Sequence, residues 1–168
     1  TQMSLLKPPA GRFEFVESPD GITAIVDYAH TPDALENILK TVLTFKKGQE
    51  RVITVVGCGG DRDVTKRPIM ARVAAKGSDR VFLTSDNPRT EDPAAILEDM
   101  KSGLDPIEMR KCISIIDRKE AIRAAALFAE SGDIVIVAGK GHETYQEING
   151  VQHDFDDRVV LHEAFIIA

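Results

Sequence analysis

Four short segments of the sequence gather charged and polar side chains beside glycine. Guanidinium groups bind carboxylates and phosphates, and carboxylates bind ammonium groups, so such segments suit a small charged ligand. Each one follows a run of apolar, largely β-branched residues, which places it where a buried strand ends. The four segments are 27–33, 57–63, 85–91 and 139–143.

Local structure alone explains part of the first segment. Thr31, Pro32 and Asp33 form a common helix start, with a capping side chain, a proline in the first turn and an acid near the positive end. Asp27 and His30 have no such explanation. We therefore treat these two residues as candidate functional residues.

In the second segment, three glycines precede Asp61, Arg62 and Asp63. Backbone amides in such a loop could form an anion-binding nest. A flexible turn would explain the glycines equally well, but it would not explain the three charged residues beside them.

The other two segments also allow a simpler interpretation. Asn87-Pro88 is a common turn sequence, which leaves Arg89 as the residue that a turn does not explain. Glycines after a strand let a ligand approach the backbone closely, although a plain loop with a solvent-exposed His142 accounts for the same residues.

Several nucleotide and hydrolase motifs are absent. The only Gly-Lys pair is Gly139-Lys140, and a P-loop would require glycine at Ile134 and Ser or Thr at Gly141. No GxGxxG, GxSxG or HExxH pattern occurs either. These absences indicate a domain that receives a nucleotide rather than one that activates it.

Strand-like and helix-like segments alternate along the chain, and they must position the four loops. This alternation predicts an α/β, Rossmann-like three-layer domain with a mostly parallel sheet of about six strands. In such sheets, ligands bind at the carboxyl ends of the strands, where all four loops fall. We predict strands at 12–16, 22–28, 51–56, 80–84, 112–116 and 133–138, and helices at 32–45, 66–76, 92–104, 118–130 and 155–167.

Two features predict antiparallel pairing in an otherwise parallel fold. The turn sequence Ser18-Pro19-Asp20-Gly21 joins the first two strands, so the sheet should be mixed. Asn149-Gly150 separates 145–148 from 151–155 and predicts a small β-hairpin near the C-terminus.

Composition excludes several classes of partner. The 168 residues include 21 basic and 27 acidic residues, a formal net charge of −6, whereas nucleic-acid binding needs clustered Lys and Arg. No apolar stretch reaches the roughly 18 residues of a membrane helix, so we expect no membrane partner. We interpret Cys58 and Cys112, which form no CxxC or metal knuckle, as reduced thiols of a cytoplasmic protein.

The N-terminal residues resemble a linker. They begin Thr1-Gln2 and continue into Leu5-Leu6-Lys7-Pro8-Pro9. We expect 1–9 to connect an upstream domain to one domain over 10–168, because this length suits a single core.

Taken together, the motifs resemble the C-terminal domain of the Mur ligases, in particular of their diaminopimelate-adding members. The resemblance covers nearly the whole chain from Pro8 onward, and the order and separation of the motifs carry it. The matching segments are 11–14, 27–36, 57–63 with 66–68, 86–89, 139–143 and 156–158.

The resemblance implies an ATP- and Mg²⁺-dependent amide-bond ligase of peptidoglycan synthesis. In this family, a central domain bearing the P-loop phosphorylates the carboxylate of UDP-N-acetylmuramoyl-L-alanyl-D-glutamate, and the amine of meso-diaminopimelate attacks the acyl phosphate. The C-terminal domain binds the amino acid and closes over ATP. Upstream N-terminal and central domains are thus implied partners, the central one also supplying the carbamylated lysine that helps to hold magnesium.

The resemblance also implies which residues bind the substrate carboxylate. Arg89 resembles the family's carboxylate-binding arginine, and Arg62 looks like a second. Asn87 would hydrogen-bond the same end, and Pro88 would stiffen the turn. Lysine lacks the distal carboxylate, so an unpaired Arg89 would also reject lysine.

The remaining implied roles concern the ammonium groups and the nucleotide. Glu143 and the carbonyl of Gly139 resemble ammonium acceptors, with Asp86 adding negative potential. Arg12 resembles an arginine that reaches the ATP phosphates. The residues expected near the ribose are Asp27, Tyr28 and His30, and His142 is either a catalytic base or an orienting loop residue.

Two alternatives remain open from the residues alone. One is a non-enzymatic amino-acid-binding module. The other is a stand-alone metal-dependent hydrolase, whose metal would lie among Asp27, His30, Asp61, Asp63 and His142.

Overall fold

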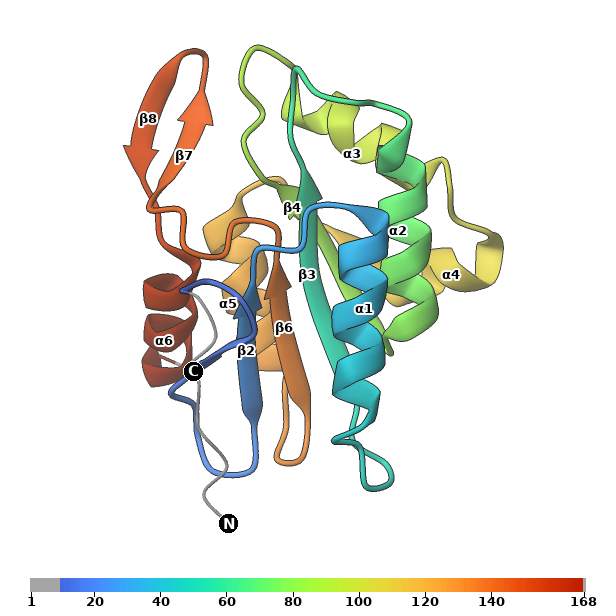
Figure 1. The fold of residues 1–168 in the computed structure, drawn as a ribbon, viewed down its shortest axis with the longest axis vertical. Coiled ribbons are helices and arrows are strands. Elements are labelled where there is room, and N and C mark those ends of the chain that lie inside the picture. Colours follow the sequence, from blue (N-terminus) through green and yellow to red (C-terminus); the bar gives the residue numbers. More distant parts are fainter. Residues whose placement is uncertain (1–9, 168) are drawn as a thin grey trace.

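The computed structural model describes residues 10–167, and the proposed linker at 1–9 lies outside them. A six-stranded sheet with the order β1-β2-β6-β3-β4-β5 forms the centre, and β7 and β8 form a separate pair (Figure 1). The strands are β1 (Glu14–Val16), β2 (Thr23–Asp27), β3 (Val52–Cys58), β4 (Arg80–Ser85), β5 (Cys112–Ser114), β6 (Ile134–Ala138), β7 (Tyr145–Ile148) and β8 (Val151–Asp154). The helices are α1 (Pro32–Leu43), α2 (Lys66–Gly77), α3 (Pro93–Lys101), α4 (Pro106–Lys111), α5 (Arg118–Phe128) and α6 (Asp157–Ile167).

The pairing confirms the predicted mixed sheet and hairpin. β1 pairs antiparallel with β2, and every other pairing in the large sheet is parallel. The β7–β8 pair is antiparallel, and Asn149 and Gly150 at its turn both have positive φ, of 50° and 78°. Such angles suit a two-residue turn whose twist matches that of the flanking strands.

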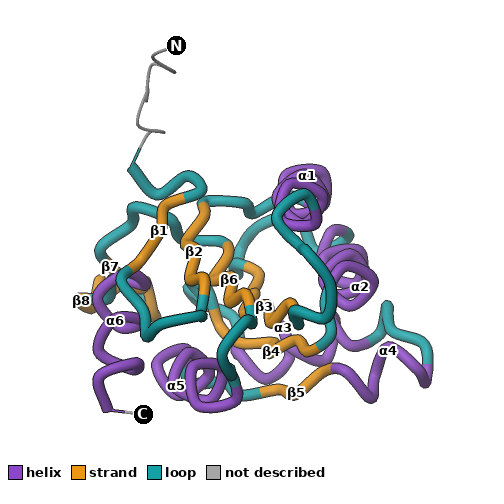
Figure 2. Tube along the Cα trace, turned by 90° about the horizontal axis from the view of Figure 1, so that it is seen from below, coloured by secondary structure: helices purple, strands orange, loops and turns teal. Residues whose placement is uncertain are grey.

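Helices cover both faces of the sheet, which makes the predicted three layers (Figure 2). On one face, Ile25, Val56 and Ile136 of the strands pack with residues of α1, α2 and α3. On the other, strand residues such as Val55 and Val137 pack with residues of α5 and α6. Alternate residues of β2, β3 and β6 thus pack into the two cores on opposite faces of the sheet. This explains why these strands are almost continuously apolar.

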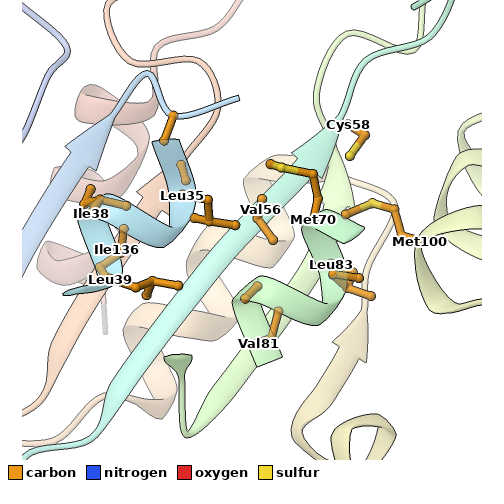
Figure 3. Packing of buried hydrophobic residues seen from close by; sticks show 14 of the residues in the cluster. Leu35, Ile38, Leu39, Val56, Cys58, Met70, Val81, Leu83, Met100 and Ile136 are labelled. Atoms are coloured by element: carbon orange, nitrogen blue, oxygen red, sulfur yellow. The ribbon is translucent and has the colours of Figure 1, made fainter. Parts of the chain in front are cut away.

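The first of these cores extends toward the carboxyl end of β3. Figure 3 shows Cys58 beside Met70 and Met100, at the end of a row that includes Val56 and Leu83. The apolar packing therefore reaches the base of the loop that follows β3 and fixes where this loop begins.

Capped helices start shortly after several strand ends. The side chain of Thr31 accepts the amide of Ala34 at the start of α1, and Asp117 accepts the amide of Glu120 at the start of α5. The predicted capping role of Thr31 is confirmed, and it places the 27–31 segment between β2 and α1.

The structure differs from the predicted elements most clearly in three places, while other element ends shift by one to three residues. Helix α4 was not predicted, because it is short and exposes Ile107 and Met109 rather than presenting one apolar face. Helix α2 includes Gly77 instead of ending before it. β1 begins at Glu14 rather than at residue 12, since Phe13 has a φ of 44°, outside the strand region. Within residues 10–167, no helix is both long and apolar enough to cross a membrane.

Candidate functional site

A polar cleft of about 350 Å³ lies at the carboxyl ends of β2, β3, β4 and β6. All four segments singled out from the sequence contribute to it, so the prediction that they converge on one edge of the sheet is confirmed. The lining residues are Tyr28, His30, Gly57, Cys58, Gly59, Arg62, Lys66, Asp86, Asn87, Arg89, Gly139, Glu143 and Tyr145.

A fully buried lysine, which the sequence reasoning did not select, organises the acidic side of the cleft. The Nζ of Lys140 lies 2.7 Å from Asn87 Oδ1, 3.2 Å from Glu143 Oε2 and 3.6 Å from Asp86 Oδ1. A buried ammonium needs such partners, because removing its hydration costs several kcal/mol. The attraction between the paired charges offsets a cost of about this size. The available signal was a lysine placed between two glycines directly after the wholly apolar strand β6.

Asn87 connects the loops within the protein. Its side-chain oxygen accepts hydrogen bonds from Lys140 Nζ and from the amide of Glu147 at 3.0 Å. Its Nδ2 donates to Glu143 Oε2 at 3.4 Å. These internal bonds give Asn87 a positioning role, in addition to the substrate contact that the resemblance implies.

Gly139 lets two of these loops approach each other. It has a φ of 118°, and a Cβ at this position would lie 2.7 Å from Asp86 Oδ2. Its amide also donates to the carbonyl of Asp27 at 3.0 Å. Glycine is therefore required here by the packing of the Asp86 side chain against the backbone.

Arg89 and Arg62 form a cationic side of the cleft. Arg89 has a φ of 51°, and its Nη1 donates to the carbonyl of Gly60 at 2.8 Å. Its Nε lies 3.3 Å from Glu147 Oε2 on β7. The guanidinium of Arg62 is exposed and donates to the carbonyl of Asp61 at 2.9 Å. Cations and acids thus line different parts of one cleft.

Two backbone amides of the 57–63 loop, where a nest was one interpretation, are bonded within the protein. The amide of Gly60 donates to the carbonyl of Asn87, and the amide of Asp61 donates to Glu91 Oε2. These two amides are engaged within the protein. The loop lines the cleft with Gly57 and Gly59 as well as with Cys58 and Arg62.

The acids of this loop also have structural roles. Asp61 accepts hydrogen bonds from the hydroxyl and the amide of Thr90, and Asp63 accepts them from Thr65. The bonds to Thr90 hold the pKa of Asp61 below its usual range. Asp61 thereby ties the loop after β3 to the loop after β4, which sequence spacing alone did not reveal.

A smaller pocket beside the cleft is lined by residues that the resemblance assigns to the nucleotide. It contains Arg12, Asp27, Tyr28 and His30. The ring of Tyr28 lies 4.6 Å from that of His30 and 5.3 Å from that of His142, measured between centroids. Burial, followed by the negative charges of Glu143 and Asp86, raises the pKa of Tyr28, so this phenol stays protonated at neutral pH.

Asp27 has a structural role that its sequence context did not explain. Its two carboxylate oxygens accept the amides of Phe13 and Ala29, each at 2.7 Å. The bond to Phe13 holds the segment before β1 against the end of β2. Arg12 is exposed next to this junction.

The geometry does not support a stand-alone metal-dependent hydrolase. Among the described residues, no group of three or more His, Cys, Asp or Glu side chains could hold a metal ion. Asp61 and Asp63 bond to threonines instead. Burial raises the pKa of Cys58 to about 12, which keeps this cleft residue as an uncharged thiol.

Behind the cleft, a second buried ion pair joins four elements. The Nη2 of Arg118 lies 2.7 Å from Asp157 Oδ2, and both side chains are fully buried. Arg118 also donates to the carbonyls of Ser85 and Ala138, the last residues of β4 and β6. The sequence suggested no role for this pair, which braces the two strand ends that precede Asp86 and Gly139.

The fold and the cleft define an α/β domain with a polar cleft, lined by side chains of both charges, at the carboxyl edge of its sheet. The chain belongs to the Mur ligase family, since the model of the Mur ligase glutamate ligase domain matches residues 11–141.

Two similar proteins and one solved structure carry the same enzyme name. The chain is 61% identical over 163 residues to UDP-N-acetylmuramoyl-L-alanyl-D-glutamate--2,6-diaminopimelate ligase of Bacteroides thetaiotaomicron, which covers 97% of this chain and 34% of that protein. It is 58% identical over 154 residues to the enzyme of the same name from Bacillus cereus, covering 92% of this chain and 30% of that protein. A solved structure of a ligase with this name matches with a TM-score of 0.85 and 51% identity, covering 94% of this chain and 32% of the other. The chain therefore spans about a third of the length of these relatives.

Proposed function

We propose that this chain is the amino-acid-binding domain of a cytoplasmic, ATP-dependent ligase. The enzyme would join meso-diaminopimelate to UDP-N-acetylmuramoyl-L-alanyl-D-glutamate in peptidoglycan synthesis. In this proposal, upstream domains of the same protein bind the nucleotide-linked substrate and hold ATP and Mg²⁺. The shared name of the relatives, at 58–61% identity, supports this assignment.

The division of charge within one cleft carries the proposal. Diaminopimelate has two carboxylates and two ammonium groups, and it needs guanidinium donors at one place and anionic acceptors at another. Arg89 and Arg62 supply the first. Asp86 and Glu143 surround the single ammonium of Lys140, so two carboxylates against one cation leave one negative charge for a substrate ammonium.

Arg89 is the residue that would distinguish diaminopimelate from lysine. The loop of Gly60 and the hairpin hold its guanidinium on two sides, so it is already oriented before a substrate carboxylate arrives. Lysine would leave this guanidinium without a substrate anion in a mostly enclosed position, which disfavours lysine.

The pocket beside the cleft would meet the nucleotide. Its residues fit such a ligand, because Arg12 is an exposed cation for phosphate and Tyr28 and His30 offer aromatic faces near Asp27. ATP would supply the phosphoryl group that activates the substrate carboxylate. In this proposal another domain holds the Mg²⁺ ion, as the resemblance implies.

The domain's chemical contribution would be positioning. The cleft holds the amino acid's charged groups, so its reacting amine can be presented in one orientation. We assign His142 an orienting role beside Tyr28, whose ring centroid lies 5.3 Å from that of His142, rather than the role of a base.

The test is the substitution Arg89→Ala in the full-length ligase. We expect the KM for meso-diaminopimelate to rise about 30- to 100-fold, corresponding to about 2–3 kcal/mol for a charge-assisted pair. The preference for meso-diaminopimelate over lysine, measured as the ratio of kcat/KM values, should fall with it.

Arg123→Ala is the matched control. It removes an arginine that pairs with Glu120 at 2.7 Å on α5 and lines none of the clefts described above. The control should leave the KM for meso-diaminopimelate and the preference over lysine within about twofold of the wild type. An unchanged KM in Arg89→Ala would contradict the proposed site.

A further inference from the structure

The β7–β8 hairpin is bonded to the loop that carries Arg89. The amide of Arg89 donates to the carbonyl of Glu147 at 3.1 Å, and the amide of Asn149 donates to the carbonyl of Arg89 at 2.9 Å. Earlier in the same loop, the carbonyl of Asp86 accepts a hydrogen bond from Gln146 Nε2 of β7. Figure 1 shows the hairpin beyond the carboxyl edge of the sheet, away from the two apolar cores.

The hairpin has little packing of its own. All residues of β8 are exposed, and all residues of β7 are only partly buried. An isolated two-stranded hairpin is at best marginally stable in water. The hydrogen bonds between the hairpin and the loop that carries Arg89 therefore hold the hairpin in position. The same bonds hold the loop.

Arg89 needs such support. Its φ of 51° lies in the left-handed region, which is unfavourable for a residue with a long side chain. Its amide and its carbonyl are both bonded to β7 or to the turn that follows it. The hairpin thus holds Arg89 in a backbone conformation that the isolated loop would rarely adopt.

Glu147 extends this support to the side chain. Its Oε2 lies 3.3 Å from Arg89 Nε, while Arg89 Nη1 donates to the carbonyl of Gly60 at 2.8 Å. A guanidinium has five N–H donors. Within residues 10–167 one of them, on Nη1, makes a hydrogen bond, while Nε contacts Glu147 as an ion pair. The other Nη1 donor and both Nη2 donors can therefore bind a carboxylate in a bidentate pair.

We infer that Glu147 is a positioning residue for Arg89 that turns the Nη1 and Nη2 edge of the guanidinium toward the distal carboxylate of the substrate. The inference rests on the proposed function, which supplies the dicarboxylate substrate. An arginine that is already held loses less side-chain entropy on binding, so the contact lowers the KM.

The negative charge of Glu147 also repels an incoming carboxylate, which opposes the effect of positioning. The geometry favours positioning, since Glu147 contacts Nε and leaves the Nη2 donors to the substrate. The Glu147 side chain is also 32% exposed, so water screens its repulsion of a more distant charge.

The experiment compares Glu147→Ala and Glu147→Gln in the full-length ligase. We expect Glu147→Ala to raise the KM for meso-diaminopimelate about fivefold, with kcat within about twofold. Glu147→Gln keeps the size of the side chain but removes the charge of the ion pair, so it should raise the KM by a similar factor. Glu98→Gln is a matched control, since Glu98 pairs with Lys101 at 2.7 Å on α3 and lines none of the described clefts.

A double-mutant cycle separates positioning from a general structural effect. In an Arg89→Ala background, Glu147→Ala should change the KM by less than about 1.5-fold, because its target is gone. An equal effect in both backgrounds, or an unchanged or lower KM for Glu147→Ala alone, would overturn the inference. A normal KM for Arg89→Ala would instead remove the proposed function on which it rests.

Discussion

The fully buried ammonium of Lys140 lies 2.7 Å from the side-chain oxygen of Asn87. This contact joins the loop after β6 to the loop after β4, which lie on strands separated by β3 in the sheet. It also places a cation between Asp86 and Glu143. The acidic side of the cleft therefore depends on a lysine that does not reach the solvent.

Substituting Lys140→Met should destabilise the domain strongly. The methionine fills a similar volume but leaves two carboxylates facing each other without the cation, and breaking a buried pair in this way costs about 3 kcal/mol. Urea unfolding followed by circular dichroism would measure the change in the free energy of unfolding. Lys40→Met removes an exposed lysine that pairs with Glu36 at 3.4 Å, and it should cost less than about 1 kcal/mol. Equal losses of unfolding free energy in Lys140→Met and Lys40→Met would contradict this account.

The pair of Arg118 and Asp157 should behave as one unit. Asp157→Asn leaves a buried guanidinium without its counter-charge, which should lower the free energy of unfolding by about 3–5 kcal/mol. The double variant Arg118→Met with Asp157→Leu removes both charges and should be more stable than either single variant. The same urea experiment tests this. A double variant whose loss of unfolding free energy equals the sum of the losses in the two single variants would refute it.

The fold was predictable because its strands have a simple pattern. The run 52–56 is buried on both faces, so continuous apolarity indicated a central parallel strand. The Asn149-Gly150 turn has the predicted hairpin geometry. Helix α4 was not predictable in this way, since its six residues expose Ile107 and Met109.

The sequence predicted where the candidate site lies, but it did not predict which of its side chains contact one another. Strand ends meet at one edge of a parallel sheet, so the four loops had to converge. The partners of individual side chains depend on tertiary contacts, such as the one between Asp61 and Thr90, 29 residues apart. Lys140 and Glu147 were missed for this reason, because a lysine is usually exposed and the position of the hairpin cannot be read from its own residues.

The contact between Asp61 and Thr90 predicts a dependence of stability on pH. The hydroxyl of Thr90, and then its amide, hold the pKa of Asp61 below its ordinary value. A lowered pKa in the folded state contributes stability above the unfolded pKa of about 4, and this contribution is lost as the pH falls through the folded value. The Tm of the wild type should therefore exceed that of Asp61→Asn at about pH 6, and the gap should narrow toward about pH 2.5. Thr90→Val removes the hydroxyl donor and should show the same narrowing in a thermal scan. A gap that stays constant over this range would exclude Asp61 as a source of acid sensitivity.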